Sequence, residues 1–449
     1  MYQIVLYLYL CGVAIASLFS EKVRKMWRGE REAIRILKER VDPQAQYVWF
    51  HAASLGEFEQ GRPLMERLRR DHPEYKILLT FFSPSGYEVR KNYEGADIVC
   101  YLPLDTIRNA RRFLRAVRPV MAFFIKYEFW YNYLHILKHR QVPVYSVSSI
   151  FRPEQVFFRW YGRQYSRVLK CFTRFFVQNE QSRELLAKLG ITEVDVVGDT
   201  RFDRVLQIRD AAKQLPLVES FTSGAPHVFV AGSSWPPDEE IFIRYFRDHP
   251  EWKLIIAPHV IGEDHLQQIE KLLEGREVIR YTQIAPLSSP ERAPLSSPEG
   301  DTVASSSKEK SNEAPSGAVG GAPRAVGGAP RAVGGALIID CFGLLSSIYR
   351  YGQVAYVGGG FGVGIHNVPE AAVWGMPVFF GPNNERFQEA QELKHNGGGI
   401  EISSYDDFAC QMDRFAADAS LITTLGNAAG SYVTDRAGAT GKIFQRLNL

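Results

Sequence analysis

QYVWFHAASLGEFEQGRPL, residues 46–64, is the stretch that decides the fold. It opens with an apolar run typical of a buried strand and passes through a glycine into a helix-like segment, where Leu64 and Leu68 share one apolar face. Glu57 falls at this junction, at the carboxyl end of a strand, which is where open α/β sheets bind their ligands. An acidic residue there also favours the positive end of a helix dipole, so position alone leaves both roles open.

Strand-like runs alternate with amphipathic, helix-like runs along the chain, and the alternation restarts after a polar stretch at 204–224. Such βαβα order predicts parallel sheets that are covered on both faces. The expected strands are Gln46–Phe50, Lys76–Phe82, Asp97–Tyr101, Val120–Ile125, Val142–Val147 and Phe175–Gln178, then His227–Ala231, Trp252–Ala257, Glu277–Tyr281, Ala336–Asp340, Gln353–Val357 and Pro377–Phe380.

A chain of 449 residues is too long for one typical core, so we expect two doubly wound α/β domains. Residues 284–335 repeat APLSSPE and AVGGAPR and hold few large apolar residues, which predicts a disordered, low-complexity insertion. The predicted parts are a membrane anchor at 1–21, an N-terminal Rossmann-like domain at 22–204, a linker at 205–222 and a C-terminal Rossmann-like domain at 223–449.

Residues 2–20 carry no charge and are just long enough to cross a bilayer. Five basic residues follow within 22–31, which predicts that everything downstream lies in the cytoplasm. A cleaved signal peptide would need basic residues before the apolar run, and there are none. We therefore expect an uncleaved single-pass anchor.

The bulk composition excludes several classes of function. A net charge of +3 is too small to indicate nucleic-acid binding. The five cysteines are scattered without a CxxC pair, and no histidine or aspartate cluster indicates a metal site. We therefore expect neither a metal nor a cofactor.

The most informative stretch of the second half is YVGGGFGVGIHNVPEAAVWGMPVFFGP, residues 356–382. A strand runs into a glycine-rich turn, and Asn367 precedes a short helix with Pro369 and Glu370 in its first turn, an arrangement that can turn backbone N–H groups toward a phosphate. The glycine spacing matches neither a P-loop nor GxGxxG, so the glycines could serve only a tight turn. The loops IIAPHV (255–260) and DCFGLLSSIY (340–349) should reach the same sheet edge.

Two further segments of the first half are unusual. In FFIKYEFWYN, residues 123–132, Glu128 is embedded among aromatic residues that would desolvate its carboxylate. Residues 151–176 interleave six basic residues with many aromatic ones, which suits an anionic membrane surface, although a solvated helix face would look the same.

Eight motifs in order, HAASLGE, FFSPSGYE, YLPLD, KYEFW, VGDTRFD, AGSSW, IIAPH and the glycine-rich stretch, resemble the bacterial 3-deoxy-D-manno-octulosonic acid (Kdo) transferases. The resemblance covers nearly the whole chain except the insertion. It implies a GT-B glycosyltransferase with two Rossmann-like domains facing a cleft. It also implies an inverting transfer from CMP-Kdo to a lipid A precursor (lipid IVA type), at the cytoplasmic face of the inner membrane, in lipopolysaccharide biosynthesis.

The resemblance also implies roles for single residues. Glu57 would be the catalytic base, and Glu128 and Arg201 would complete the catalytic set. The CMP contacts would be Pro258, His259, Phe342, Gly343, Leu344, Asn367, Val368, Pro369 and Glu370. Three places depart from the family pattern: APHV (257–260) lacks the usual arginine after its proline, Leu344 replaces an acid, and Lys126 stands where many members carry another acid.

Two other functions remain open. Another GT-B enzyme, such as a UDP-sugar transferase or a UDP-GlcNAc 2-epimerase, would share the strand–glycine–helix site but use a different donor. A membrane-tethered, non-catalytic binder of lipid or nucleotide would need no catalytic base at residue 57.

Overall fold

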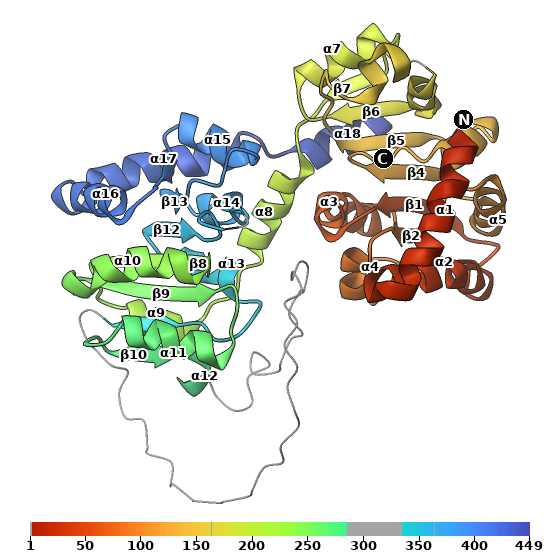
Figure 1. The fold of residues 1–449 in the computed structure, drawn as a ribbon. Helices are drawn as coiled ribbons and strands as arrows, with labels where there is room; N and C mark the ends of the chain where they lie inside the picture. Colours follow the sequence, from red (N-terminus) through yellow and green to blue (C-terminus); the bar gives the residue numbers. More distant parts are fainter. Residues whose placement is uncertain (1, 163, 285–334, 363) are drawn as a thin grey trace, which may run out of the picture. The chain divides into compact units, whose positions relative to one another are not determined.

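The computed structural model describes residues 2–162, 164–284, 335–362 and 364–449, without the side chains of residues 2–5 and 7. These residues form two compact units, 1–206 with 436–449 and 207–435 (Figure 1). The sequence predicts disorder for residues 284–335. Of these, residues 285–334 lie outside the described part of the chain.

The first unit is built on a seven-stranded sheet in the order β3-β2-β1-β4-β5-β6-β7, in which every neighbouring pair is parallel. The strand order reverses between β1 and β4, so the loops after these two strands diverge from one point of the sheet. The strands are β1 (Gln46–Ala52), β2 (Tyr75–Phe81), β3 (Ile98–Tyr101), β4 (Met121–Ile125), β5 (Val144–Ser149), β6 (Arg174–Val177) and β7 (Val194–Val196).

Helices cover both faces of this sheet. Trp49 and Phe124 pack beneath α2, α5 and α6, whereas Phe50 and Phe123 pack on the other face with α3 and α18. The central strands are therefore buried on both sides, which explains their nearly continuous apolar sequences. The helices of this unit are α1 (Tyr2–Phe19), α2 (Glu21–Arg40), α3 (Leu55–Asp71), α4 (Pro84–Arg90), α5 (Ile107–Val117), α6 (Tyr131–His139), α7 (Glu180–Lys188), α8 (Thr200–Asp210) and α18 (Ala439–Leu447).

The second unit repeats the plan with a parallel sheet in the order β10-β11-β9-β8-β12-β13-β14, which reverses between β8 and β12. Its strands are β8 (His227–Ser234), β9 (Trp252–Pro258), β10 (Val278–Arg280), β11 (Ala336–Ile338), β12 (Val354–Val357), β13 (Val378–Phe380) and β14 (Gly399–Glu401). Its helices are α9 (Pro216–Thr222), α10 (Pro236–Asp248), α11 (Glu263–Leu272), α12 (Tyr281–Ile284), α13 (Leu345–Ile348), α14 (Val368–Ala372), α15 (Gln388–His395), α16 (Tyr405–Ala417) and α17 (Ser420–Thr434).

The domain boundaries differ from the sequence prediction at two places. The predicted linker at 205–222 is largely helical, and the division between the units falls inside α8. Residues 436–449, which the sequence assigned to the C-terminal domain, belong to the first unit, because Ile443 and Phe444 of α18 are buried in its core. The final helix thus completes the N-terminal domain.

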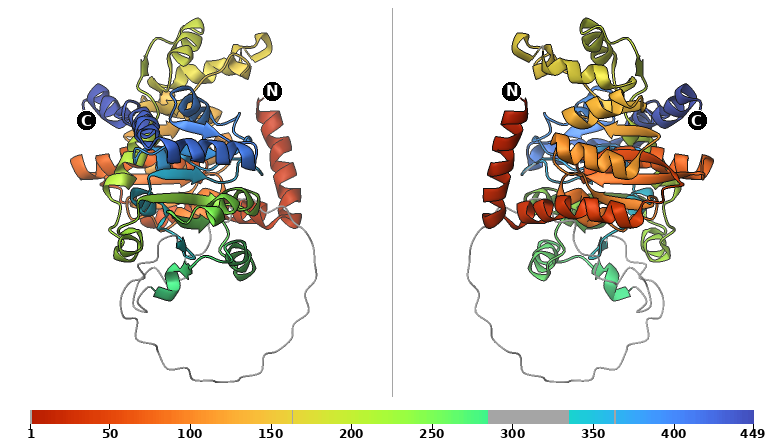
Figure 2. Two further views of the ribbon diagram at one scale, coloured as in Figure 1. Left: turned by 90° about the vertical axis from the view of Figure 1, so that its left-hand side faces the viewer. Right: turned by 90° about the vertical axis from the view of Figure 1, so that its right-hand side faces the viewer.

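The N-terminal helix α1 meets α2 at Ser20, where the chain turns (Figure 2). Val13 of α1 packs with Met26 and Tyr101, while Leu18 and Phe19 are exposed. Among the described residues, no helix combines the length and the apolarity needed to cross a membrane. The single-pass anchor predicted at residues 1–21 is therefore not confirmed.

Candidate active site

Glu57 and Glu128 come from the two neighbouring strands at which the first sheet reverses its order. Glu57 lies in the first turn of α3, which follows β1, and Glu128 lies in the loop after β4. The carboxyl ends of β1 and β4 are adjacent because the strands pair in parallel. The charge of Glu128 acts on the carboxyl group of Glu57, so the fold brings together two acids that are far apart in the sequence.

Glu57 both caps a helix and carries an unusual pKa. Its Oε2 accepts hydrogen bonds from the N–H groups of Ala53 at 2.5 Å and Ser54 at 3.2 Å. Burial and the negative charge of Glu128 nevertheless raise the pKa of Glu57 to about 7, against the opposing effects of these hydrogen bonds and of Lys126. A carboxyl group with this pKa is a proton acceptor matched to neutral pH. One side chain therefore caps α3 and also has a pKa suited to proton transfer at neutral pH.

Glu128 is held by two donors. Its Oε2 accepts hydrogen bonds from Nε2 of His51 at 3.0 Å and from Nε1 of Trp130 at 2.6 Å. His51 is fully buried, and its Nδ1 contacts Oγ1 of Thr80 at 2.9 Å. Sequence reasoning missed His51, although it opens the HAASLGE motif at the end of β1.

Arg201 lies at the start of α8, where a buried aspartate fixes it. Asp199 accepts hydrogen bonds from the backbone N–H and Nε of Arg201, both at 2.9 Å, and also from Gln60 and Gln178. The side chain of Arg201 remains 42% exposed, so it is oriented yet accessible. Burial raises the pKa of Tyr127, whose hydroxyl also feels the charges of Arg201 and Glu57. The predicted catalytic residues therefore share one edge of the first sheet.

In the second unit, aromatic rings from three loops form a stack at the carboxyl edge of the sheet. The rings of Trp235 and His259 stack at 4.7 Å, and those of His259 and His366 at 4.5 Å. Nε1 of Trp235 donates to Nε2 of His366 at 3.4 Å. Burial, aided by His259, lowers the pKa of His366 to about 4, so its ring is neutral at pH 7. Trp235 and His366 were not among the residues singled out from the sequence.

Neighbouring backbone atoms leave no space for a side chain at the start of the glycine-rich loop after β12. A Cβ on Gly358 would lie 2.2 Å from the carbonyl oxygen of Ser233, which allows no larger residue. Asp238 then holds the loop by accepting the N–H of Gly359 at 2.9 Å. These contacts hold the start of the loop against the end of β8 and the first turn of α10.

The predicted donor-site residues are unequally accessible. Asn367 is exposed and donates to Oε1 of Glu370 at 2.7 Å, and Gly343 is exposed with φ 87°. Phe342 is half-buried, whereas Pro258 is buried at the end of β9. Leu344, Val368 and Pro369 are buried.

The basic and aromatic segment 151–176 forms short 3-10 turns at Val156–Phe158, Trp160–Gly162 and Tyr165–Cys171 in place of an amphipathic helix. Trp160 is 88% exposed and Tyr161 62% exposed. Arg174 is paired with Asp195 and Glu193 and so does not contribute a free charge.

The chain is similar to known proteins in sequence and in fold. Residues 28–204 match the family model described as 3-deoxy-D-manno-octulosonic-acid transferase (kdotransferase). The 3-deoxy-D-manno-octulosonic acid transferase of Aquifex aeolicus is 25% identical over 373 residues, 81% of this chain and 84% of that protein. The transferase of the same description from Haemophilus influenzae is 24% identical over 418 residues, 90% of this chain and 87% of that protein.

Solved structures support the fold alone. UDP-GlcNAc 2-epimerase from Neisseria meningitidis, bound to UDP-GlcNAc, aligns over 90% of this chain and 100% of its own with a TM-score of 0.57 at 13% identity. MurG from Acinetobacter baumannii aligns over 90% and 99% with a TM-score of 0.51 at 10% identity. The chain thus has two parallel-sheet α/β units with GT-B-like structural neighbours, its residues 28–204 match the 3-deoxy-D-manno-octulosonic-acid transferase family model, and its sequence relatives are transferases of that description.

Proposed function

We propose that this protein transfers Kdo from CMP-Kdo to a lipid A precursor of the lipid IVA type, with inversion at the anomeric carbon and without a metal or cofactor. The observation that carries the proposal is the pKa of Glu57, which burial and Glu128 raise to about 7. A carboxylate of this basicity can accept the proton of a sugar hydroxyl at neutral pH. A non-catalytic binder would have no use for it.

In the proposed step, the acceptor hydroxyl attacks the anomeric carbon of the donor and Glu57 takes its proton. The bond from that carbon to the phosphate oxygen breaks, and CMP departs with the electron pair. Arg201, oriented by Asp199, is the cation that would balance the charge growing on the phosphate. Glu128, held by His51 and Trp130, raises the basicity of Glu57 through its charge.

We assign CMP to the carboxyl edge of the second sheet. The stacked rings of Trp235, His259 and His366 there are neutral or apolar surfaces against which a pyrimidine can pack. The exposed Asn367 and its partner Glu370 offer polar groups to the ribose, and exposed Gly343 offers backbone N–H. Competition with the donor by CMP rather than by UDP would support this assignment, and the reverse result would favour a UDP-sugar enzyme.

We also propose that the protein works at the cytoplasmic face of the inner membrane. Leu8, Ile15, Leu18 and Phe19 of α1 are 60–86% exposed, which is unusual for apolar side chains facing water. Trp160 and Tyr161 are exposed in the same unit. Arg159, which directly precedes them, is exposed as well. Aromatic and basic side chains of this kind suit the headgroup region of an anionic membrane.

The test is to incubate the purified full chain with CMP-Kdo and lipid IVA and to weigh the glycolipid by mass spectrometry. The proposal expects a product heavier than lipid IVA by one or more Kdo residues. No product from CMP-Kdo, with turnover of a UDP-sugar, would support the alternative GT-B enzyme. Binding of CMP and lipid without turnover of any donor would support the non-catalytic binder.

A further inference from the structure

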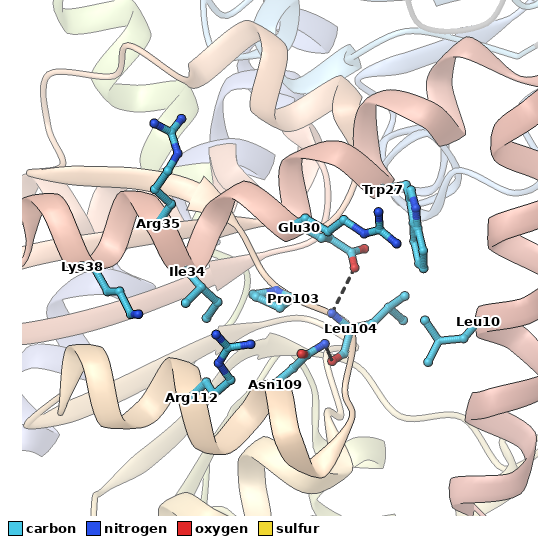
Figure 3. A pocket seen from close by; sticks show the side chains of 11 residues that line it. Leu10, Trp27, Glu30, Ile34, Arg35, Lys38, Pro103, Leu104, Asn109 and Arg112 are labelled. Atoms are coloured by element: carbon cyan, nitrogen blue, oxygen red, sulfur yellow. Dashed lines mark hydrogen bonds between the residues drawn. The ribbon is translucent and has the colours of Figure 1, made fainter.

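A pocket of about 460 Å³ lies in the first unit, in the corner between α1 and α2 and against the loop before α5 (Figure 3). Its volume falls within the range of about 300–1,000 Å³ that small-ligand sites occupy. None of the residues assigned above to catalysis or to CMP lines it. The pocket is therefore unexplained by the transferase site.

The rim of the pocket is cationic. Lys38 of α2 and Arg112 of α5 point toward one another across it, next to Ile34 (Figure 3). Within the described part of the chain, neither side chain forms a hydrogen bond or an ion pair. Arg31 lies with its guanidinium 4.5 Å from the centre of the Trp27 ring and also has no acidic partner among the described residues. Arg35, in contrast, is paired with Glu32 and Glu39.

The acidic residue of the pocket does not cancel this charge. Glu30 is only 5% exposed, and its Oε2 accepts the N–H of Leu104 at 3.1 Å while Oε1 has no partner among the described atoms. Burial raises the pKa of Glu30 to about 8, so its carboxyl group is mostly protonated at pH 7. The neighbouring tyrosines that feel its charge, Tyr9, Tyr101 and Tyr133, have raised pKa values and stay neutral as well. The pocket is therefore positive at neutral pH.

The opposite wall of the pocket is apolar. Leu10 of α1 faces Trp27 of α2 and Leu104 across the cavity (Figure 3). Beyond Leu10, the surface of α1 offers further exposed apolar side chains, including Leu8 and Tyr9. One opening thus presents cations on one side and a continuing apolar surface on the other. Such a surface matches an amphiphile with an anionic head.

We propose that this pocket binds the phosphate headgroup of an anionic lipid, with the phosphate between Lys38 and Arg112 and the start of an acyl chain against Leu10 and Leu104. A free phosphate ion shares the head chemistry but lacks the chain. A nucleotide would leave the apolar wall unfilled. The proposal does not depend on which sugar the enzyme transfers, since the pocket contains none of the residues assigned to that reaction.

The test uses the full chain and dihexanoyl phosphatidic acid at concentrations where the lipid is monomeric, with binding measured by calorimetry. The pocket variant is Lys38→Gln with Arg112→Gln. Its matched control is Arg28→Gln with Arg111→Gln, which removes two exposed cations from the same two helices outside the pocket. Inorganic phosphate, which has no acyl chain, tests the contribution of the acyl chain. Dihexanoyl phosphatidylcholine, whose head has no net charge, tests the contribution of the head charge.

Because each cation near a phosphate contributes about a factor of five to affinity, the pocket variant should bind phosphatidic acid at least about tenfold more weakly than the wild type. The control should bind like the wild type, and inorganic phosphate and phosphatidylcholine should bind at least about tenfold more weakly. If the pocket variant misfolds in circular dichroism, the single substitution Lys38→Gln gives the same comparison.

Equal weakening in pocket variant and control would reduce the effect to general surface charge and would overturn the proposal. Inorganic phosphate binding as tightly as the lipid would assign the pocket to a free ion. If phosphatidylcholine bound as tightly as phosphatidic acid, the affinity would come from the apolar wall alone, and the proposal would be overturned. Loss of lipid binding can be told apart from failure of the transferase proposal, since the calorimetry needs no sugar donor.

Discussion

His51 and Glu128 lie 77 residues apart in the sequence, yet Nε2 of one contacts Oε2 of the other at 3.0 Å. Around this contact, Nε1 of Trp49 donates to Oγ1 of Thr80 at 2.8 Å, and Nδ1 of His51 lies 2.9 Å from the same Oγ1 and 3.2 Å from the carbonyl oxygen of Thr80. A buried relay thus ends on the carboxylate whose charge raises the pKa of Glu57. The relay makes Glu128 a positioning and tuning group for Glu57.

Glu57→Gln should lower kcat about 10²- to 10⁴-fold, because the amide cannot accept a proton. The amide oxygen can still accept the N–H groups of Ala53 and Ser54, so α3 should stay capped and the fold intact. The measurement is the initial rate of glycolipid formation, with circular dichroism as the check on folding. Glu88→Gln, which removes an exposed carboxylate on α4, is the control and should keep the wild-type rate. Turnover retained in Glu57→Gln would exclude it as the base.

The pH dependence of kcat/KM should show an ascending limb with a midpoint near 7, the pKa of Glu57. Two substitutions should move this midpoint in opposite directions. Glu128→Gln removes a negative charge that raises the pKa of Glu57, so the midpoint should fall. Lys126→Met removes a positive charge that lowers it, so the midpoint should rise. Profiles between pH 5 and 9 decide the matter, and shifts of the same sign in both variants would contradict the assignment of the limb to Glu57.

The sequence predicted the strands well where burial is complete, since a strand covered on both faces must be an apolar run. It missed β7 and β14, which are three-residue edge strands with half-buried or exposed side chains and therefore carry no such run. Glu57 could be found because a strand, a glycine and a helix follow one another locally. Hydrogen-bond partners could not be found in this way. Glu128 pairs with His51, 77 residues earlier, and Asp199 pairs with Gln60, 139 residues earlier. Such pairs form only when distant segments of the chain meet in the fold.

The C-terminal helix illustrates the same limit. Asp203 accepts the N–H groups of Gly438 and Thr440 at the start of α18, and the guanidinium of Arg67 lies 4.6 Å from the Phe444 ring. Nothing in residues 436–449 indicates these partners, because an amphipathic helix does not specify the surface that it covers. The assignment of this helix to the C-terminal domain was wrong for that reason.

Phe444→Ala should destabilise the first unit by about 3–5 kcal/mol, because it empties a fully packed position in that core. In urea unfolding of the purified full chain, the transition of the first unit should move to a lower urea concentration, while the transition of the second unit stays in place. Gln445→Ala, exposed on the same helix, should change neither transition. A variant that shifts only the transition of the second unit would return α18 to that unit.

Glu30→Gln should flatten the dependence of stability on pH. The folded state raises the pKa of Glu30 from 4.5 to about 8, so between these values it binds a proton that the unfolded chain has already lost. Stability is therefore lost as pH rises through this window, by roughly 2 kcal/mol between pH 6 and pH 9. Glutamine accepts the N–H of Leu104 but cannot ionise, so the variant should lose less stability over that interval. Unfolding in urea at both pH values measures the difference, with exposed Glu94→Gln as the control. Parallel pH curves for wild type and Glu30→Gln would mean that the carboxyl group reaches solvent and is not buried as the structure places it.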